Sequence, residues 1–513
     1  MRSVATISTA HCYIKISDFY GEFAAQVIQP FCKAHLYKLG KVPIPGSRKT
    51  GWKVTHVFAR SNFERDEYRL PRSLLKEFLE FAQSRGYNPT RIKIDVVPEL
   101  VGIPTQFEFQ PGYENTRPGQ DEWINYQLAP GPVKVNNAST GFGKTYMALR
   151  TMLKIGQRSL ITVQPRYVAT WIKALGDILK LKPEDVLIWE QDLSKLPDVL
   201  ARGDVNPKII ILTITRIDVY LRNEKKDAGV PSLDHIFDRL GCGLRIIDEG
   251  HESIHQICMS LFYGNFPKLL LLSATLTADD PFINKMYKVM FPFHIRLKEP
   301  EPENYIDIVA YLYDINPRKY NLKTMQFGSY NDLTWEQSIL GNKAVFQFYF
   351  EVAKKAFEDY YMNVREEGTK CLFFFSRVNM CEAMLKMFQQ YYPAMDFATF
   401  TGEDTKGKDA DKDKYLKHEI VITTPGSCGT GKDIGGLVTV ISFHMVSSQQ
   451  RNKQMIGRLR ELLKKFGGLI TPTFVFPVCK SQPKHRDYTK KREIAFEAKK
   501  KSFKFIDSFC SLD

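Results

Sequence analysis

The chain has 513 residues, with 72 lysines and arginines against 57 aspartates and glutamates, so its formal net charge is +15 at pH 7. A chain of this length forms two to four domains with real cores, and 43% hydrophobic residues is ordinary for a globular protein. The strong positive charge favours an anionic polymer as partner, either a nucleic acid or an acidic membrane surface.

Cysteines and apolar runs exclude several other classes of protein. The nine cysteines are scattered and form no Cys-x-x-Cys pair, which argues against a zinc site or a redox motif. Their odd number and the lack of a secretory signal favour a reducing cytosol, so we expect a cytoplasmic protein. The longest apolar runs, such as 269–272 and 371–375, have the length of strands and are too short to span a bilayer.

Residues 1–103 are predicted to form a small α+β domain. Apolar alternation predicts strands at 11–16, 52–59 and 91–97, and an amphipathic pattern with proline near its start predicts a helix at 70–82. This part of the chain shows no catalytic constellation.

A change of pattern near residue 104 predicts a parallel α/β sheet, because strands and helices then alternate. Short apolar runs predict buried strands at 133–135, 159–163, 208–212, 244–247 and 268–272. A stretch rich in proline and glutamate at 297–304 is interpreted as a linker. A second series of strands is predicted at 370–375, 395–400, 419–423 and 438–443. We therefore expect two tandem α/β lobes, residues 104–298 and 299–475.

Residues 476–513 are predicted to form a basic C-terminal helix or tail. Lysines and arginines cluster at 484–486, 490–492 and 499–504. These clusters are interpreted either as a solvated helix face or as a further contact to a nucleic-acid backbone.

The segment from Ala138 to Thr145 reads Ala-Ser-Thr-Gly-Phe-Gly-Lys-Thr and lies between a predicted strand and a predicted helix. Such a turn of small residues is a phosphate cradle, because backbone N–H groups and the helix N-terminus face the anion. Lys144 is expected to reach the β- and γ-phosphates, and the Thr145 hydroxyl to hold Mg²⁺. The residues expected to contact the nucleotide here are Ser139, Thr140, Gly141, Phe142, Gly143, Lys144 and Thr145. The alternative is a chance glycine-rich turn.

A second half of an ATP site follows about 100 residues later, where the strand at 244–247 ends in Asp248 and Glu249. Asp248 is expected to hold Mg²⁺, and Glu249 to orient and deprotonate the attacking water. An acidic turn without function is the alternative for Asp-Glu alone. The next strand ends in the polar turn at 273–275, which we expect to link the ATP site to the neighbouring lobe.

Two further segments carry candidate side chains. Upstream of the loop, Arg117 and Gln120 stand in Arg-Pro-Gly-Gln, and a glutamine can read an adenine edge with its paired donor and acceptor. In the second lobe, Arg458 and Arg460 lie on a predicted helix at 454–460, and arginine suits the charge of a transferring phosphoryl group. An arginine supplied by another lobe would make hydrolysis depend on domain closure.

Together and in this order, the motifs resemble those of superfamily 2 helicases and translocases, over roughly residues 105–465. Within the superfamily, three features resemble the phage recombination and repair helicases of the UvsW group. They are Asp-Glu-Gly-His at 248–251, the long threonine-to-glycine spacing at 423–431, and the N-terminal pattern at 51–52 and 81–87. If the chain is phage-encoded, its location would be the host cytoplasm.

The resemblance implies two RecA-like lobes with ATP in the cleft, an accessory nucleic-acid-binding role for residues 1–103, and contacts that track one strand without reading its sequence. It adds Gly431 and Asp433 to the nucleotide site. It implies nucleic-acid contacts at Pro165, Arg166, Thr215, Arg216, Ser376, Arg377, Thr401, Gly402 and Thr424. One departure concerns the last motif. The family's second arginine falls on Glu461 here, and Arg460 comes one residue early, so Arg458 is the better candidate for the arginine finger.

We therefore predict a monomeric, ATP- and Mg²⁺-dependent DNA helicase that unwinds or branch-migrates recombination, replication or R-loop intermediates. Its DNA would be single-stranded or branched. An alternative is a helicase for RNA or RNA–DNA hybrids, since backbone contacts do not separate the two. A non-enzymatic nucleic-acid clamp is disfavoured because Lys144 and Glu249 are both present. A membrane partner is disfavoured because the sequence has no amphipathic anchor.

Overall fold

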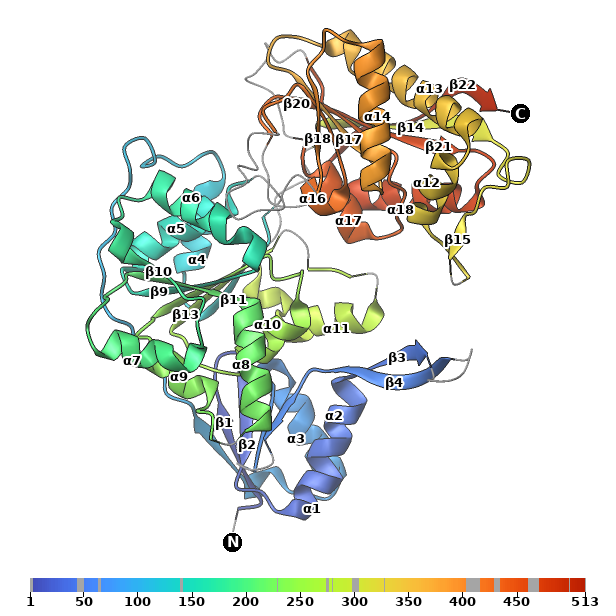
Figure 1. Cartoon of the computed structure of the whole chain (residues 1–513). Coiled ribbons are helices and arrows are strands. Elements are labelled where there is room, and N and C mark those ends of the chain that lie inside the picture. Colours follow the sequence, from blue (N-terminus) through green and yellow to red (C-terminus); the bar gives the residue numbers. More distant parts are fainter. Residues whose placement is uncertain are drawn as a thin grey trace. The chain divides into compact units, whose positions relative to one another are not determined.

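The computed structural model contains two compact units, Met1–Glu299 and Pro300–Asp513. Figure 1 shows the first in blue through green and the second in yellow to red. The structure describes residues 3–43, 50–62, 66–138, 142–227, 229–273, 276–278, 280–297, 304–326, 328–402, 416–428, 434–459, 470–497 and 499–512. Most of the predicted linker at 297–304 lies outside these residues.

The N-terminal part of the first unit is a mixed sheet with helices on it. Its strands run in the order β5-β6-β2-β1-β7, and all neighbours are antiparallel except β1 and β7. The strands are β1 (Ala5–Thr9), β2 (Tyr13–Ser17), β5 (Arg60–Asn62), β6 (Glu67–Pro71) and β7 (Ile92–Val96). The helices are α1 (Gly21–Phe23), η1 (Ala24–Ile28), α2 (Gln29–His35), η2 (Arg72–Leu74), α3 (Leu75–Ser84) and η3 (Pro89–Arg91). A separate antiparallel hairpin consists of β3 (Tyr37–Pro43) and β4 (Thr50–Val57).

The rest of the first unit is built on a parallel sheet in the order β10-β11-β9-β12-β13-β8. The strands are β8 (Val133–Asn136), β9 (Ser159–Val163), β10 (Val186–Ile188), β11 (Ile209–Thr213), β12 (Leu244–Asp248) and β13 (Lys268–Leu272). The helices are α4 (Gln120–Leu128), α5 (Lys144–Ile155), α6 (Val168–Ile178), α7 (Leu196–Ala201), α8 (Ile214–Lys226), α9 (Leu233–Arg239), α10 (Ile254–Leu261) and α11 (Pro281–Met290). Short 3₁₀ turns are η4 (Pro165–Tyr167), η5 (Pro183–Asp185), η6 (Leu193–Lys195) and η7 (Phe293–Ile295).

Continuous apolar runs form these strands because both faces of the sheet are covered. Along β13, Leu270 packs in one buried cluster and Leu271 in another, and Ile246 and Ile247 of β12 divide in the same way. Successive side chains of a strand point to opposite faces. A strand between two cores therefore needs apolar residues at every position, as the sequence pattern predicts.

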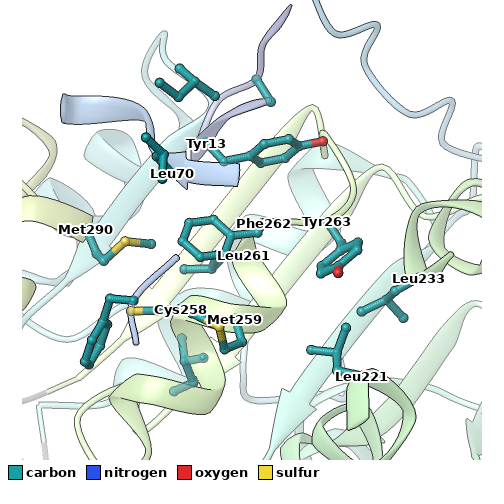
Figure 2. Packing of buried hydrophobic residues seen from close by; sticks show 14 of the residues in the cluster. Tyr13, Leu70, Leu221, Leu233, Cys258, Met259, Leu261, Phe262, Tyr263 and Met290 are labelled. Atoms are coloured by element: carbon teal, nitrogen blue, oxygen red, sulfur yellow. The ribbon is translucent and has the colours of Figure 1, made fainter. Parts of the chain in front are cut away.

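The N-terminal domain shares its core with the adjacent lobe. Tyr13 and Leu70 belong to the same buried cluster as Phe262 and Met290, and Figure 2 shows these side chains close together. Arg69 joins the two parts further. It is 3% exposed, donates from Nη1 to the Phe262 carbonyl (2.6 Å) and pairs through Nη2 with Asp234 (2.6 Å). The boundary that we predict at residue 103 therefore lies inside one compact unit.

The second unit carries a parallel sheet in the order β18-β19-β17-β20-β21-β14-β22. The strands are β14 (Ile306–Ile315), β17 (Lys370–Phe374), β18 (Phe397–Phe400), β19 (Ile420–Thr423), β20 (Leu437–Ser442), β21 (Thr473–Cys479) and β22 (Lys500–Leu512). β15 (Met325–Gln326) and β16 (Ser329–Tyr330) form a small separate pair. The helices are α12 (Asp332–Leu340), α13 (Lys343–Tyr360), η8 (Met362–Val364), α14 (Val378–Tyr391), α16 (Pro425–Cys428), α17 (Gln449–Ile456) and α18 (Pro483–Phe496). The predicted fold class, two parallel-sheet lobes after a small α+β domain, is confirmed.

The C-terminal segment, which we predict as a basic helix or tail at 476–513, contains the helix α18 and also contributes strands to the sheet. β21 crosses the predicted boundary, α18 packs on α17, and β22 pairs in parallel with β14 as an edge strand. The lysines that suggested a tail, Lys500, Lys501 and Lys504, lie on this edge strand. Charged residues at a sheet edge discourage pairing with another chain, so a basic pattern and a strand are compatible.

Because His485 is buried in the second unit, we expect this unit to lose stability in acid. His485 is 2% exposed; its Nδ1 accepts from the Cys479 amide (3.2 Å), and its Nε2 lies 2.7 Å from the hydroxyl of Tyr330, which itself bonds Asp332. Burial lowers the pKa of His485 to about 4. Because this pKa lies below that of an unfolded histidine, stability is present above about pH 6.5 and is lost as pH falls towards 4, by at most ~1.4 kcal/mol per pH unit.

Urea unfolding of the full chain between pH 7 and 5 measures this effect. His485→Asn should flatten the pH dependence, whereas His294→Asn, at an exposed site in the first unit, should leave it as in the wild type. Equal slopes for the wild type and His485→Asn would contradict the prediction.

Within the described part of the chain, no helix is long and apolar enough to cross a membrane.

Candidate active site

The motifs of the first lobe follow neighbouring strands at one edge of the sheet. Asp248 at the end of β12 is in register with Leu272 of β13, which in turn is in register with Asn136 of β8. β9 pairs with β12 on its other side. The segments after these four strands therefore meet at the carboxyl edge of the sheet, where parallel α/β sheets bind their ligands.

The described part of the predicted phosphate loop places a buried lysine at a helix start. α5 begins at Lys144, directly after Gly143, which has a φ of +93° and supplies no side-chain cap. Lys144 is 9% exposed, and its Nζ donates to the Ala138 carbonyl (3.2 Å). Ser139, Thr140 and Gly141 lie outside the described residues, while Thr145 is half-buried in the first turn of α5.

Gln120 fastens the preceding segment to this loop. Its side chain is 2% exposed; Nε2 donates to the Phe142 carbonyl (2.7 Å), and Oε1 accepts from the Arg117 amide (2.9 Å). A Cβ on Gly143 would lie 2.4 Å from Gln120 Nε2, so this approach requires glycine. A primary amide has a second hydrogen and a second lone pair on its oxygen, the donor–acceptor pair that the predicted adenine contact requires. Arg117 itself is exposed.

Asp248 and Glu249 form an acidic pair beside this lysine. Asp248 Oδ2 accepts from Trp171 Nε1 (2.8 Å), and Oδ1 accepts from the Glu249 amide (2.9 Å). Burial, reinforced by the charge of Glu249, raises the pKa of Asp248 to about 7, while the bond from Trp171 and the charge of Lys144 oppose the rise. A buried carboxylate in this setting is stabilised by an added cation.

The backbone and His251 fix the position of Glu249. Glu249 has a φ of +48°, a left-handed conformation that is uncommon outside glycine and that costs energy. His251 Nδ1 lies 3.2 Å from Glu249 Oε2 and 2.9 Å from Ser273 Oγ. Because burial lowers the pKa of His251 to about 4, its ring is neutral at pH 7 and can orient Glu249 without neutralising it.

The residues at this edge fit a magnesium nucleotide. Lys144 and the uncapped N-terminus of α5 suit phosphate groups, and the hydroxyl of Thr145 with the carboxylate of Asp248 supplies the oxygen ligands that Mg²⁺ prefers. The described residues contain no group of three histidine, cysteine or acidic side chains that could hold a metal alone. Binding of Mg²⁺ through one carboxylate and the nucleotide's phosphates is the arrangement that this donor set favours.

The residues of the first lobe that we predict to contact nucleic acid lie at the same edge of the sheet. Pro165 and Arg166 follow β9 and are exposed. Arg166 pairs with Glu252, which also accepts from the Tyr167 hydroxyl (2.8 Å). Glu252 is a residue that sequence reasoning missed, although it directly follows His251. A shallow groove beside it is lined by Gln164, Pro165, Arg166, Glu252 and Ser253.

Thr215 and Arg216 lie in the first turn of α8, after β11. The Arg216 amide donates to Thr213 Oγ1 (3.3 Å), so Thr213 caps the helix and fixes the turn. Thr215 is exposed.

In the second unit, the predicted contacts also follow neighbouring strands. Ser376 and Arg377 come after β17, Thr401 and Gly402 after β18, and Thr424 after β19. The amides of Ser376 and Arg377 donate to the two carboxylate oxygens of Glu336 (2.7 and 2.8 Å). Glu336 lies on α12 and is fully buried. No sequence signal singled it out, because its motif partners are 40 residues away.

Arg458 differs from the expected position on a helix. α17 ends at Ile456, Gly457 is its C-cap, and Arg458 follows in a turn, with its amide bonded to the Met455 carbonyl (3.2 Å). The side chain is 2% exposed. Because Arg458 lies beyond the end of α17, helical periodicity does not set the direction of its side chain. Arg460, Gly431 and Asp433 lie outside the described residues.

Among the comparisons with known proteins, only the comparison with solved structures found matches. No protein-family model and no curated protein matches the sequence. Dbp5 of S. cerevisiae bound to RNA and ADP BeF3 is similar, with a TM-score of 0.50 and 13% identity over 77% of this chain and 91% of that chain. The Hef helicase domain of Pyrococcus furiosus gives 0.44 and 14% over 72% and 97%. Mss116p bound to ssRNA and AMP-PNP gives 0.47 and 17% over 76% and 74%.

The likeness to Dbp5 covers about three quarters of the chain. At this level of identity the likeness concerns the fold. The chain therefore has two tandem RecA-like lobes, the fold class that we predict.

Proposed function

We propose that the chain is an ATP-dependent nucleic-acid helicase or translocase. The observation that carries the proposal is the meeting of Lys144, Asp248 and Glu249 at the carboxyl edge of one parallel sheet. Each was predicted from its motif, and the three lie at or after the ends of β8 and β12, two strands that both pair with β13. The architecture shared with helicases and the net charge of +15 support the same function.

We assign a separate role in ATP hydrolysis to each residue at this edge of the sheet. Lys144 holds the β- and γ-phosphates against the start of α5, and Gln120, which bonds the Phe142 carbonyl, holds the adenine. When bound, Mg²⁺ neutralises charge between the phosphates, with Thr145 and Asp248 as its protein ligands. Glu249, aimed by His251, takes the proton of the attacking water. We assign the arginine finger to Arg458 and further nucleotide contacts to Gly431 and Asp433.

We propose DNA as the track, and branched recombination, replication or R-loop intermediates as substrates. The proposal rests on the resemblance of Asp-Glu-Gly-His at 248–251 and of the N-terminal pattern to the UvsW group. An RNA track is the second candidate, because Dbp5 and Mss116p were both solved with RNA bound. An ATPase assay with single-stranded DNA, forks, four-way junctions, RNA–DNA hybrids and RNA separates the two. Strongest stimulation by RNA would replace the DNA proposal.

Salt dependence gives an independent prediction. If about six phosphates contact basic residues, the logarithm of the affinity should fall with the logarithm of salt concentration with a slope of roughly −4 to −5. Fluorescence anisotropy of a labelled fork between 50 and 200 mM salt measures the slope. An affinity that does not change with salt would show that the basic surface does not hold nucleic acid.

A further inference from the structure

The hairpin β3–β4 leaves the N-terminal sheet as a two-stranded arm, as Figure 1 shows. Its strands pair from Tyr37 with Val57 to Pro43 with Thr50. A two-stranded hairpin is marginally stable by itself, so it needs contacts with the rest of the protein at its root.

The root of the hairpin is held by the ATP-binding lobe. His255 of α10 bonds the Val57 carbonyl (2.9 Å) and packs edge-on against Phe58, while Lys38 pairs with Asp280 at the start of α11 (2.7 Å). α10 follows the Asp-Glu-Gly-His motif after two residues. The hairpin is therefore anchored to the helix that follows the motif containing Glu249.

A bulge interrupts the pairing of the strands next to the root. The pairing shifts between Lys38 and Leu39, and the extra residue Thr55 donates from Oγ1 to the Lys38 carbonyl (3.2 Å). A Cβ on Gly40 would lie 2.7 Å from Thr55 Cγ2, so glycine is needed for this packing. Bulges bend a strand and redirect its side chains.

Beyond the bulge, one face of the hairpin is apolar and exposed. Leu39 lies opposite Val54 and Lys41 opposite Trp52, and alternation along each strand places these four side chains on one face. The exposed fractions of Leu39, Trp52 and Val54 are 58%, 69% and 38%. An exposed patch of this kind marks an interaction site.

The charge of the hairpin selects nucleic acid as the occupant. The segments Tyr37–Pro43 and Thr50–Val57 contain Lys38, Lys41 and Lys53 and no acidic residue. Lys41 Nζ lies 5.5 Å from the centroid of the Trp52 ring. Proteins bind unpaired nucleotides through positive charge for the backbone and an aromatic ring for the base.

We propose that this hairpin binds the junction between paired and unpaired nucleic acid, where Trp52 stacks on an exposed base and Lys41 and Lys53 contact phosphates. Because its root is fixed to α10 and α11, the hairpin moves with the ATP-binding lobe and separates strands as that lobe advances. This inference rests on the proposed function of the chain as a helicase.

The test is Trp52→Ala in the full chain, with Phe293→Ala as a control at a residue of the same unit that is 68% exposed. Loss of one base–aromatic stack should weaken binding to a labelled fork by about 5- to 100-fold. Base pairs opened per ATP hydrolysed should fall about tenfold, and Trp52→Phe should recover part of both. The double variant Lys41→Ala/Lys53→Ala should lower the salt slope, with exposed Lys76→Ala as its control.

The outcomes separate this inference from the function it rests on. A wild-type chain without nucleic-acid-stimulated ATPase would overturn the helicase proposal. A wild-type chain that unwinds forks, with Trp52→Ala equal to it in fork affinity and in unwinding per ATP, would overturn the hairpin inference alone. If in addition a folded Trp52→Ala chain lost only binding to another protein, the face would be a protein-docking surface instead. Thermal unfolding of each variant confirms that it is folded.

Discussion

Replacement of Lys144 by alanine is expected to abolish ATP hydrolysis while nucleic-acid binding persists. Lys144 is a buried cation at the start of α5, and its Nζ donates to the Ala138 carbonyl (3.2 Å). Preorganised charges at a phosphoryl-transfer site typically contribute 100- to 1,000-fold to the rate, so we expect a loss of at least about that size.

The carboxylate of Asp248 is expected to enlarge the effect of Lys144→Ala on ATP hydrolysis. The charge of Lys144 lowers the pKa of Asp248 against the opposing effects of burial and of Glu249. Without the lysine, the pKa of Asp248 rises above its present value of about 7, and at pH 7 more of the carboxyl group is protonated. A protonated Asp248 is a poor ligand for Mg²⁺, so the variant should also need more Mg²⁺ for any remaining hydrolysis.

The measurement is steady-state ATPase activity with saturating single-stranded DNA over a range of Mg²⁺ concentrations. Lys154→Ala is the matched control, because Lys154 is an exposed lysine in the last turn of the same helix. Fork binding without nucleotide should be equal for the wild type and both variants. Full ATPase activity in Lys144→Ala would remove the main support for the proposed function.

The sequence was most informative where a pattern reports a local constraint. Strands buried on both faces must be apolar throughout, and β9 and β13 lie at the predicted residues. The turn at Gly143 and the acidic end of β12 could be recognised because a phosphate site needs small residues and carboxylates at fixed places along the chain. These features depend on neighbours in sequence and not on the tertiary fold.

Features that depend on distant contacts could not be predicted. β22 has exposed lysines and acquires its role by pairing with β14, almost 200 residues earlier. Glu336 matters because the chain brings α12 beneath Ser376 and Arg377. The hairpin β3–β4 was recognised only as one strand, and the exposure of Trp52 became evident only from the structure.

Glu249→Gln should separate ATP binding from ATP hydrolysis, with hydrolysis slowed by about 100- to 10,000-fold, the usual contribution of a general base. Glutamine has the same shape, so the contact with His251 can persist and the backbone strain at this residue is unchanged. Removal of the negative charge lowers the pKa of Asp248, because Glu249 contributes to its elevation. Mg²⁺ and ATP should then bind at least as tightly as in the wild type, in contrast to Lys144→Ala.

Because Glu249→Gln is expected to keep tight binding of ATP and Mg²⁺ and Lys144→Ala is not, the two variants together separate ATP binding from ATP hydrolysis. Equilibrium binding of a fluorescent ATP analogue and single-turnover hydrolysis measure the two steps, with Glu80→Gln on α3 as a control at an exposed glutamate. A Glu249→Gln chain that binds ATP and stalls on a fork would identify Glu249 as the base. If the variant hydrolysed ATP at the wild-type rate, another group would have to accept the proton of the attacking water. His251 contacts Glu249, but its pKa of about 4 makes it a weak base at pH 7.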